Sequence, residues 1–161
     1  MAERDYRTDE IVVHWDSSRC VHSGICLRSL HNVFNLQARP WVDVQAASAD
    51  EIAATIEKCP SGALSYTRPD GPGEAPAETT TIVPTRDGPL YVRGDVEVRD
   101  AGGALLAAGY RMALCRCGHS QNQPFCDLSH RDVGFTDNPL VIEDDRQNAA
   151  DPSGVSGRGT G

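Results

Sequence analysis

Cys115-Arg116-Cys117-Gly118-His119-Ser120-Gln121-Asn122-Gln123-Pro124-Phe125-Cys126-Asp127-Leu128-Ser129-His130 places three thiols and two imidazoles within sixteen residues. Three cysteines with one histidine are enough ligands for one tetrahedral metal ion or one small cluster. Cys126 and His130 are four residues apart, so a single helical turn would put them on one face. Cys115 and Cys117 project the same way if that segment is extended. The segment therefore predicts a metal centre held by Cys115, Cys117, Cys126 and His130.

This segment resembles the CDGSH family of 2Fe-2S proteins, whose best-known members are of the mitoNEET type. Its pattern is matched at the following positions: Cys115, Cys117, Ser120, Pro124, Cys126, Asp127, Ser129 and His130. Leu128 stands where the family has glycine, and the resemblance extends over about residues 82–139. It implies a 2Fe-2S cluster in which one iron takes two cysteines and the other takes a cysteine and His130. Structural zinc on the same four residues is the alternative.

A neutral imidazole ligand has two expected consequences. It removes negative charge from the cluster, which raises the reduction potential as histidines do in Rieske centres. It must also be unprotonated to bind, so ligation competes with protons near the ordinary histidine pKa of about 6.5. We expect an acid-labile cluster, with Asp127 as a capping or supporting residue rather than a catalytic acid.

The other three cysteines are Cys20, Cys26 and Cys59, and an odd number in each group argues against simple disulfide pairing. Cys20, Cys26 and the later Cys59-Pro60 have the outline of a bacterial ferredoxin loop, but Ser23 occupies the middle cysteine position. Over about residues 9–67 the chain resembles the divergent single-cluster ferredoxins. Three cysteines imply a 3Fe-4S cluster, which we favour, or a 4Fe-4S cluster whose fourth iron takes Ser23, His22 or solvent.

The two resemblances imply an α+β fold in which a ferredoxin-like domain precedes a small β-rich CDGSH domain, and the hydrophobic pattern places the helices and strands within it. In the first domain, strands are expected at 11–13, 41–44 and 63–66, and apolar residues at helical spacing follow Cys26 up to residue 34. Ser48 and Glu51 form a capping box that opens a helix. Pro60 disfavours helical geometry at Cys59, so the helix should end there with Cys59 toward the core.

The second half reads as strands at 90–92 and 96–98, a turn at 100–103 and a returning strand within 104–114 that delivers Cys115. Residues 68–81 contain glycine and proline without a large apolar residue, which is linker composition. We therefore expect a ferredoxin domain at 1–67, a linker at 68–81, a CDGSH domain at 82–139 and a disordered tail at 140–161.

Composition narrows the classes of partner. A formal net charge of −8 repels nucleic acid and favours a partner with a basic face. The longest apolar run, 104–108, is far below the ~20 residues that span a bilayer, so no membrane anchoring is expected. The charged start, residues 1–5, has no apolar segment of a secretory signal, which favours a cytoplasmic location where cysteine clusters more often bind metal.

Two clusters with different ligands would differ in reduction potential, which makes a stepwise electron path available. The expected function is a single-electron carrier for a cytoplasmic oxidoreductase, with a homodimer as one arrangement. The alternative is storage or transfer of a cluster, or redox sensing, through the labile His130 ligand. The sequence shows no nucleotide-binding glycine loop, flavin motif or nucleophile–base pair, so we do not expect an enzyme.

Overall fold

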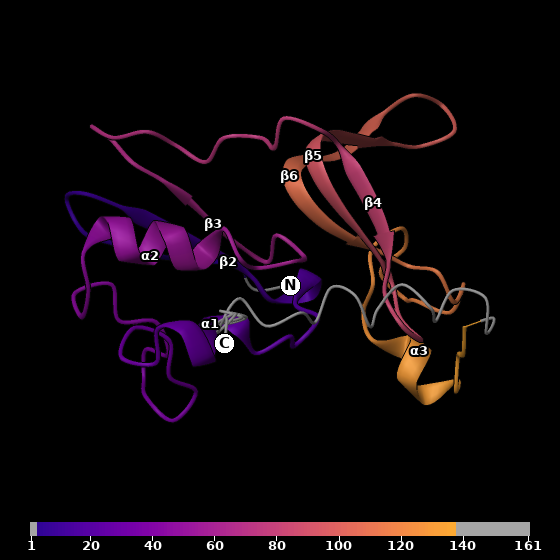
Figure 1. Cartoon of the computed structure of the whole chain (residues 1–161), viewed down its shortest axis with the longest axis horizontal. Helices are drawn as coiled ribbons and strands as arrows, with labels where there is room; N and C mark the ends of the chain where they lie inside the picture. Colours follow the sequence, from indigo (N-terminus) through magenta and orange to yellow (C-terminus); the bar gives the residue numbers. More distant parts are fainter. Residues whose placement is uncertain (1–2, 138–161) are drawn as a thin grey trace, which may run out of the picture.

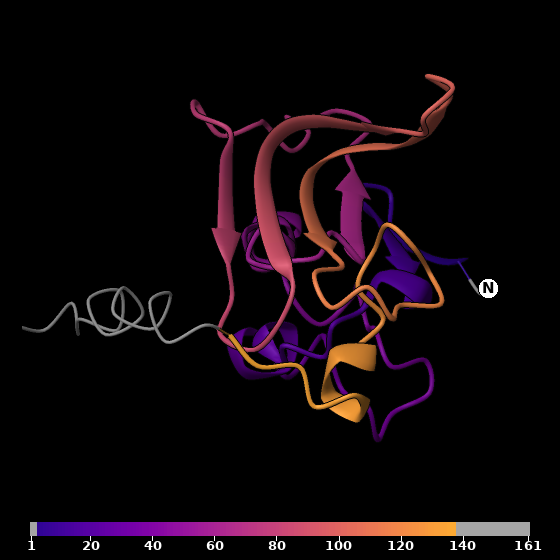
Figure 2. The ribbon, with the colours of Figure 1, turned by 90° about the vertical axis from the view of Figure 1, so that its right-hand side faces the viewer.

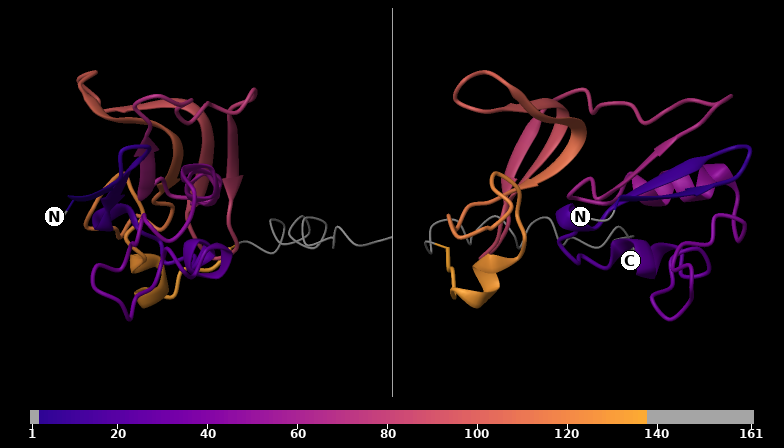
Figure 3. Two further views of the ribbon diagram at one scale, coloured as in Figure 1. Left: turned by 90° about the vertical axis from the view of Figure 1, so that its left-hand side faces the viewer. Right: turned by 180° about the vertical axis from the view of Figure 1, so that it is seen from behind.

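The structure is a computed structural model that describes residues 3–137. It has two lobes, each built on one antiparallel three-stranded sheet (Figure 1). A long connecting segment runs from the first lobe to the second along one side of the molecule (Figures 1 and 3). The predicted tail at 140–161 lies outside the described residues. The α+β class is confirmed.

The first sheet has the order β1-β2-β3, with strands Glu3–Arg7, Val12–Asp16 and Leu64–Thr67. Helix α2, Ala49–Ile56, packs on this sheet, and the shorter α1, Ile25–Ser29, lies beside α2. The core between them consists of aliphatic and aromatic side chains: Ile11, Val13, Val33, Phe34, Val42, Val44, Ala49, Ile52, Ala53, Ile56, Leu64 and Tyr66. Strand β1 has no buried residue and was not predicted, because its charged sequence lacks an apolar face.

The capping box at the start of α2 is confirmed. The Ser48 hydroxyl accepts a hydrogen bond from the Glu51 amide at 3.3 Å, and the Glu51 carboxylate accepts one from the Ser48 amide at 3.1 Å. This reciprocal pair satisfies two amides that would otherwise be orphaned at the helix start. The helix ends at Ile56, three residues before the end predicted at Cys59, while Cys59 is partly buried against the core as the sequence predicted.

Two predictions for the segment between α1 and α2 are wrong. Residues 41–44 do not form a strand, since only Val42 pairs with Phe34 in an isolated bridge. The side chains of Asn35 and Asp43 each accept a hydrogen bond from the backbone amide two residues on, at 2.9 and 3.0 Å. Such local bonds compete with a ladder and turn the chain. The helical spacing that continues to residue 34 likewise stops at Ser29, where α1 ends.

The second sheet has the order β4-β5-β6, with strands Thr81–Pro84, Leu90–Arg99 and Leu105–Leu114 (Figure 2). The two predicted strands at 90–92 and 96–98 are halves of the single strand β5. A register shift between Arg93 and Val96 interrupts the pairing with β6, and Gly94 there has φ 144°. A glycine in that conformation is typical of a bulge. The returning strand was predicted correctly, whereas the exposed β4 was not predicted.

Among residues 3–137, no helix has the length and apolar character needed to cross a lipid bilayer.

Candidate metal centres

The loop with Cys115, Cys117 and Cys126 folds back onto the end of β6. The Cys115 amide donates to the Pro124 carbonyl at 2.8 Å, and the Cys126 amide donates to the Ala113 carbonyl at 2.9 Å. Within the loop, the buried Ser120 hydroxyl donates to the Phe125 carbonyl at 2.6 Å. These bonds fix the backbone on both sides of the thiols, so the fold itself brings Cys126 back beside β6.

The four side chains that the sequence singled out form two close pairs. The sulfurs of Cys115 and Cys117 are 3.7 Å apart, and the Cys126 sulfur is 3.5 Å from His130 Nδ1. Metal–sulfur bonds near 2.3 Å and metal–nitrogen bonds near 2.0 Å at tetrahedral angles give ligand separations of about 3.8 Å for two sulfurs and about 3.5 Å for sulfur and nitrogen. Each pair therefore has the spacing of two ligands on one metal atom.

The pairs do not merge into a single-ion site. Within residues 3–137, no three His, Cys, Asp or Glu side chains lie together in a way that would hold one metal ion. A tetrahedral zinc needs all four ligands around one point, whereas a 2Fe-2S cluster offers two irons that take two protein ligands each. The arrangement of these four side chains fits the two-iron cluster better than zinc.

Hydrogen bonds prepare this site for thiolates. Burial alone would raise the pKa of Cys115, but the Ser120 and Gly118 amides outweigh it and lower that pKa. The His119 amide donates to the Cys117 sulfur at 3.4 Å, and the Leu128 amide donates to the Cys126 sulfur at 3.4 Å. Amides aimed at sulfur favour the charged form of the thiol. Burial still raises the pKa of Cys126, so in the absence of metal the site holds unequal thiols.

His130 is held neutral in this site. Its side chain is buried, and desolvation together with the nearby Arg131 lowers its pKa below the ordinary value. A neutral imidazole with Nδ1 turned to the Cys126 sulfur is in the protonation state that binds a metal. The structure thus places His130 beside Cys126, as the sequence predicted. The effect of its basic neighbour Arg131 was not predicted from the sequence.

The predicted helical turn from Cys126 to His130 is wrong in form, although it is right in bringing the two side chains together. Helix α3, Ser129–Asp132, begins only after Leu128, which has a left-handed φ of 75°. Asp127 closes this turn: its carboxylate accepts hydrogen bonds from the Ser129 hydroxyl and amide, and the first of these contributes most to lowering its pKa to about 2. Asp127 therefore supports the loop.

Leu128 occupies a conformation that glycine adopts without cost. A left-handed backbone costs other residues roughly 1–2 kcal/mol. Leu128 packs against a small cluster made of Val21, Ala113 and Cys126, and this contact offsets part of the strain. The position where this chain departs from the CDGSH pattern thus keeps the backbone shape that a glycine would supply.

The first group of cysteines lies at three ends of secondary structure. Cys20 follows the short 3-10 helix Ser17–Arg19, Cys26 lies in the first turn of α1, and Cys59 follows α2. All three are partly buried free thiols. Burial raises the pKa of Cys20 and of Cys26, and negative charge on Cys59 raises both further. The three thiols thus interact electrostatically, so a cation or a positively charged iron cluster would stabilise them together as thiolates.

The two other candidates near these thiols, Ser23 and His22, lie in the loop before α1. His22 is exposed and has a left-handed φ of 49°. The Ser23 hydroxyl accepts a long hydrogen bond from the Ile25 amide at 3.5 Å. Gly24 enters α1 with φ 70°, and its missing Cβ leaves room for the Arg28 guanidinium. The loop geometry is therefore fixed by backbone conformations around Gly24.

The two candidate metal centres are neighbours. Val21, next to Cys20, is buried against Ala113 and Cys126 of the other lobe. The Asn122 side chain donates to the Ser18 carbonyl at 3.1 Å, which adds a polar contact between the two ligand loops. Nothing in the sequence pattern identified Val21, because one valine in a loop carries no periodicity.

Comparison with known proteins gives the same division of the chain. A family model described as a divergent 4Fe-4S mono-cluster matches residues 6–69, and a second described as an iron-binding zinc finger of CDGSH type matches residues 87–131. The chain thus contains one domain that matches each model. It is an iron–sulfur protein that joins one domain of each type.

The first domain is also similar to two proteins over most of their length. It is similar to the uncharacterized protein YjdI of Escherichia coli strain K12 and of Escherichia coli O157:H7. Each match is 36% identical over 63 residues, which are 39% of this chain and 83% of the relative. The CDGSH-type domain of this protein is therefore additional to the part shared with these relatives.

Proposed function

We propose that this protein carries one iron–sulfur cluster in each domain and transfers single electrons to or from an oxidoreductase in the cytoplasm. Cys115 and Cys117 would hold one iron of a 2Fe-2S cluster, and Cys126 with His130 Nδ1 would hold the other. Cys20, Cys26 and Cys59 would hold the cluster of the ferredoxin-like domain. When bound, each cluster accepts and releases one electron without any bond to a substrate being made or broken.

The observation that carries this proposal is a cluster of buried side chains shared by the two candidate centres. Val21, which follows Cys20 in the chain, belongs to the same buried cluster as Ala113 and Cys126. Tyr91 packs against this cluster. Burial raises the pKa of Tyr91, and the negative charges of Cys126 and Cys59 raise it further. Tyr91 therefore lies near one cysteine of each group.

For the first cluster we propose the three-iron form. The chain offers three cysteines there, the Ser23 hydroxyl is directed to a backbone amide, and His22 is exposed. A four-iron cluster with a fourth ligand from Ser23, His22 or solvent is the competing assignment, and the 4Fe-4S description of the matching family model favours it.

The expected partner is a redox protein with a basic docking face. The net charge of −8 supports this, since opposite charge steers two proteins together. Such association should weaken as the salt concentration rises. Salt-dependent rates of electron delivery to the partner would measure this contribution.

Anaerobic purification followed by iron and sulfide analysis and electron paramagnetic resonance tests the proposal. We expect ~5 irons per chain for the three-plus-two assignment and ~6 if the first cluster is complete. Stoichiometric reduction and reoxidation of both clusters without iron loss would support the electron carrier. Transfer of the 2Fe-2S unit to an apo-acceptor would instead support cluster handling through His130. A folded protein with only zinc would exclude both.

A further inference from the structure

Arg111 of strand β6 is a charged side chain that reaches from the second domain into the first. Its guanidinium is buried, and Nη1 donates hydrogen bonds to the carbonyls of Ile56 at 2.7 Å and Cys59 at 2.6 Å. Nη2 donates to the Leu64 carbonyl at 3.0 Å. The three carbonyls flank the turn that joins α2 to β3 and carries Cys59. Arg111 thus holds the backbone of a cluster ligand from outside the ferredoxin-like domain.

A positive charge at the C-terminal end of α2 stabilises this helix. The last carbonyls of a helix lack partners within the helix and carry partial negative charge. The last turn of α2 contains no basic residue. The Ile56 carbonyl accepts a hydrogen bond from the Cys59 amide at 2.9 Å, and Arg111 donates a second one and brings a full positive charge to that end. The second domain therefore supplies a buried cation to this helix end, in addition to Arg19 of the first domain, whose charge interacts with Cys59 and Arg111.

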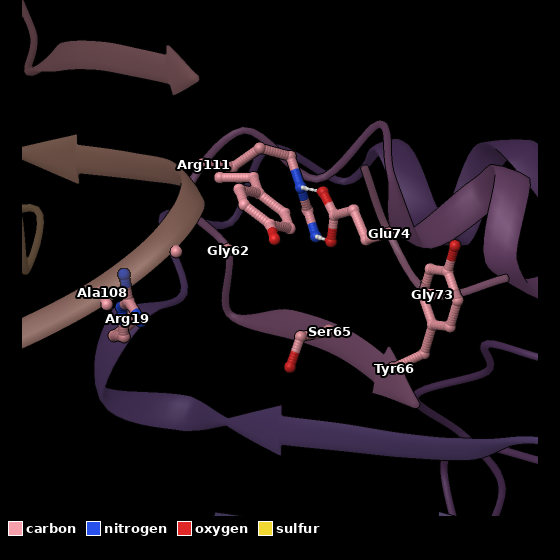
Figure 4. A pocket seen from close by; sticks show the side chains of 10 residues that line it. Arg19, Gly62, Ser65, Tyr66, Gly73, Glu74, Ala108 and Arg111 are labelled. Carbon is pink, nitrogen blue, oxygen red and sulfur yellow. Dashed lines mark hydrogen bonds and ion pairs between the residues drawn. The ribbon is translucent and has the colours of Figure 1, made fainter. Parts of the chain in front are cut away.

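Glu74, in the segment between the domains, holds the other edge of the guanidinium. Its carboxylate accepts hydrogen bonds from Arg111 Nε at 2.5 Å and Nη2 at 2.7 Å (Figure 4). With the three carbonyls, this occupies all five N–H groups of the arginine. The two side chains are only 3% and 11% exposed, at the edge of a cavity of about 340 Å³ that Tyr110 also lines.

A buried charge beside a cluster ligand affects the free energy of reduction. Reduction adds one negative charge to a cluster, so a nearby cation stabilises the reduced state and a nearby anion destabilises it. Arg111 touches the carbonyl of Cys59, and Glu74 binds the far side of the same guanidinium. The two charges therefore act on the cluster with opposite sign, and burial weakens their screening by water.

We propose that Arg111 and Glu74 together set the reduction potential of the first cluster, so that this potential depends on docking of the second domain. This inference rests on the proposed cluster at Cys20, Cys26 and Cys59. Arg111 is a positioning residue, since it acts through the Cys59 backbone and its own charge. Because Arg111 belongs to β6 of the second domain and its three carbonyl partners belong to the first, undocking would remove the cation from the cluster.

The test is a redox titration of the whole protein followed by electron paramagnetic resonance of the first cluster. Glu74→Gln leaves the cation without its counter-charge, so we expect the potential to rise. Arg111→Gln removes the cation and leaves Glu74, so we expect it to fall. The double variant Arg111→Gln/Glu74→Gln should lie between the two single variants. The exposed pair Arg99–Glu97 provides a matched control, and Glu97→Gln should leave the potential unchanged.

The outcomes separate this inference from the proposed function. Absence of a first-cluster signal in the unaltered protein would remove the proposed cluster itself. A retained signal with potentials that do not move, or that move in the same direction in both single variants, would overturn only the role of Arg111 and Glu74. If Arg111→Gln fails to fold, two other single variants test the role of the charges. Arg111→Lys should keep the potential of the first cluster near its original value, and Glu74→Gln should raise it.

Discussion

Replacement of His130 by cysteine should convert an acid-labile 2Fe-2S cluster into a more acid-resistant one. His130 Nδ1 lies 3.5 Å from the Cys126 sulfur, in the position of a ligand on the same iron. Protonation of that nitrogen removes its lone pair and ends ligation. A thiolate at the same position binds iron with a full negative charge and does not depend on the protonation of an imidazole. The variant should therefore release the cluster more slowly in mild acid.

The pH window follows from the direction of the His130 pKa. Burial and Arg131 lower this pKa, whereas the unfolded chain keeps a value near 6.5. The folded state therefore binds fewer protons than the unfolded state, so the stability linked to this group is present above pH ~6.5 and is lost as the pH falls below it. Below the lowered pKa, each further pH unit costs about 1.4 kcal/mol of ligation, or about tenfold in the equilibrium.

The assay is the decay of visible absorbance after transfer from neutral to mildly acid buffer. Across two pH units below the pKa of the site, the original protein should lose ligation by a factor approaching ~100. His130→Cys should decay more slowly. His119→Gln provides the control, since His119 is exposed and only its backbone amide contacts Cys117. Equal decay rates of the original protein and His130→Cys would refute a role for the imidazole.

Three further variants test other parts of the structure. Ser48→Ala removes the capping box shared with Glu51 and should lower the free energy of unfolding by ~1 kcal/mol, measured by denaturant titration. Ser23→Cys supplies a thiol at the vacant ferredoxin position and should raise the iron content by about one per chain; an unchanged count in a folded protein would argue against the three-iron form. Val21→Asp puts a charge against buried Cys126 and should make residues 68–81 more sensitive to proteolysis, whereas Val21→Ile should not.

The cysteine spacing predicted the candidate ligands, while the way they come together depends on tertiary structure. Cys126 and His130 were expected to meet on a helix, and they meet because Leu128 adopts a left-handed turn that Asp127 closes. A helical turn and a left-handed turn at Leu128 both bring residues four positions apart together. The sequence therefore predicts that Cys126 and His130 meet, but not which backbone turn brings them together. The assignment of each ligand stays a prediction until metal analysis of the variants.

Local signals predicted the elements that depend on local chemistry. The capping box at Ser48 needed only a few neighbouring residues and is confirmed, whereas α2 ends at Ile56, three residues before the end predicted at Cys59. Residues 41–44 alternate like a strand, but they pair with residues 33–35 only through an isolated bridge, because turns closed by the Asn35 and Asp43 side chains lie beside it. Arg111 could not be recognised from sequence, since its three carbonyl partners lie 47 to 55 residues away.

Contacts between the two domains contribute to the stability of their small cores. The cluster of buried apolar residues next to the second site consists of Val21, Ala113 and Cys126, so one of its three members comes from the first domain. Small domains bury too little surface to be stable without help from metals or partners. Val21 of the first domain thus shares a buried cluster with Ala113 of β6. The ion pair of Arg111 and Glu74 then ties the connecting segment to the same boundary, and the stability of each cluster site becomes dependent on the other domain.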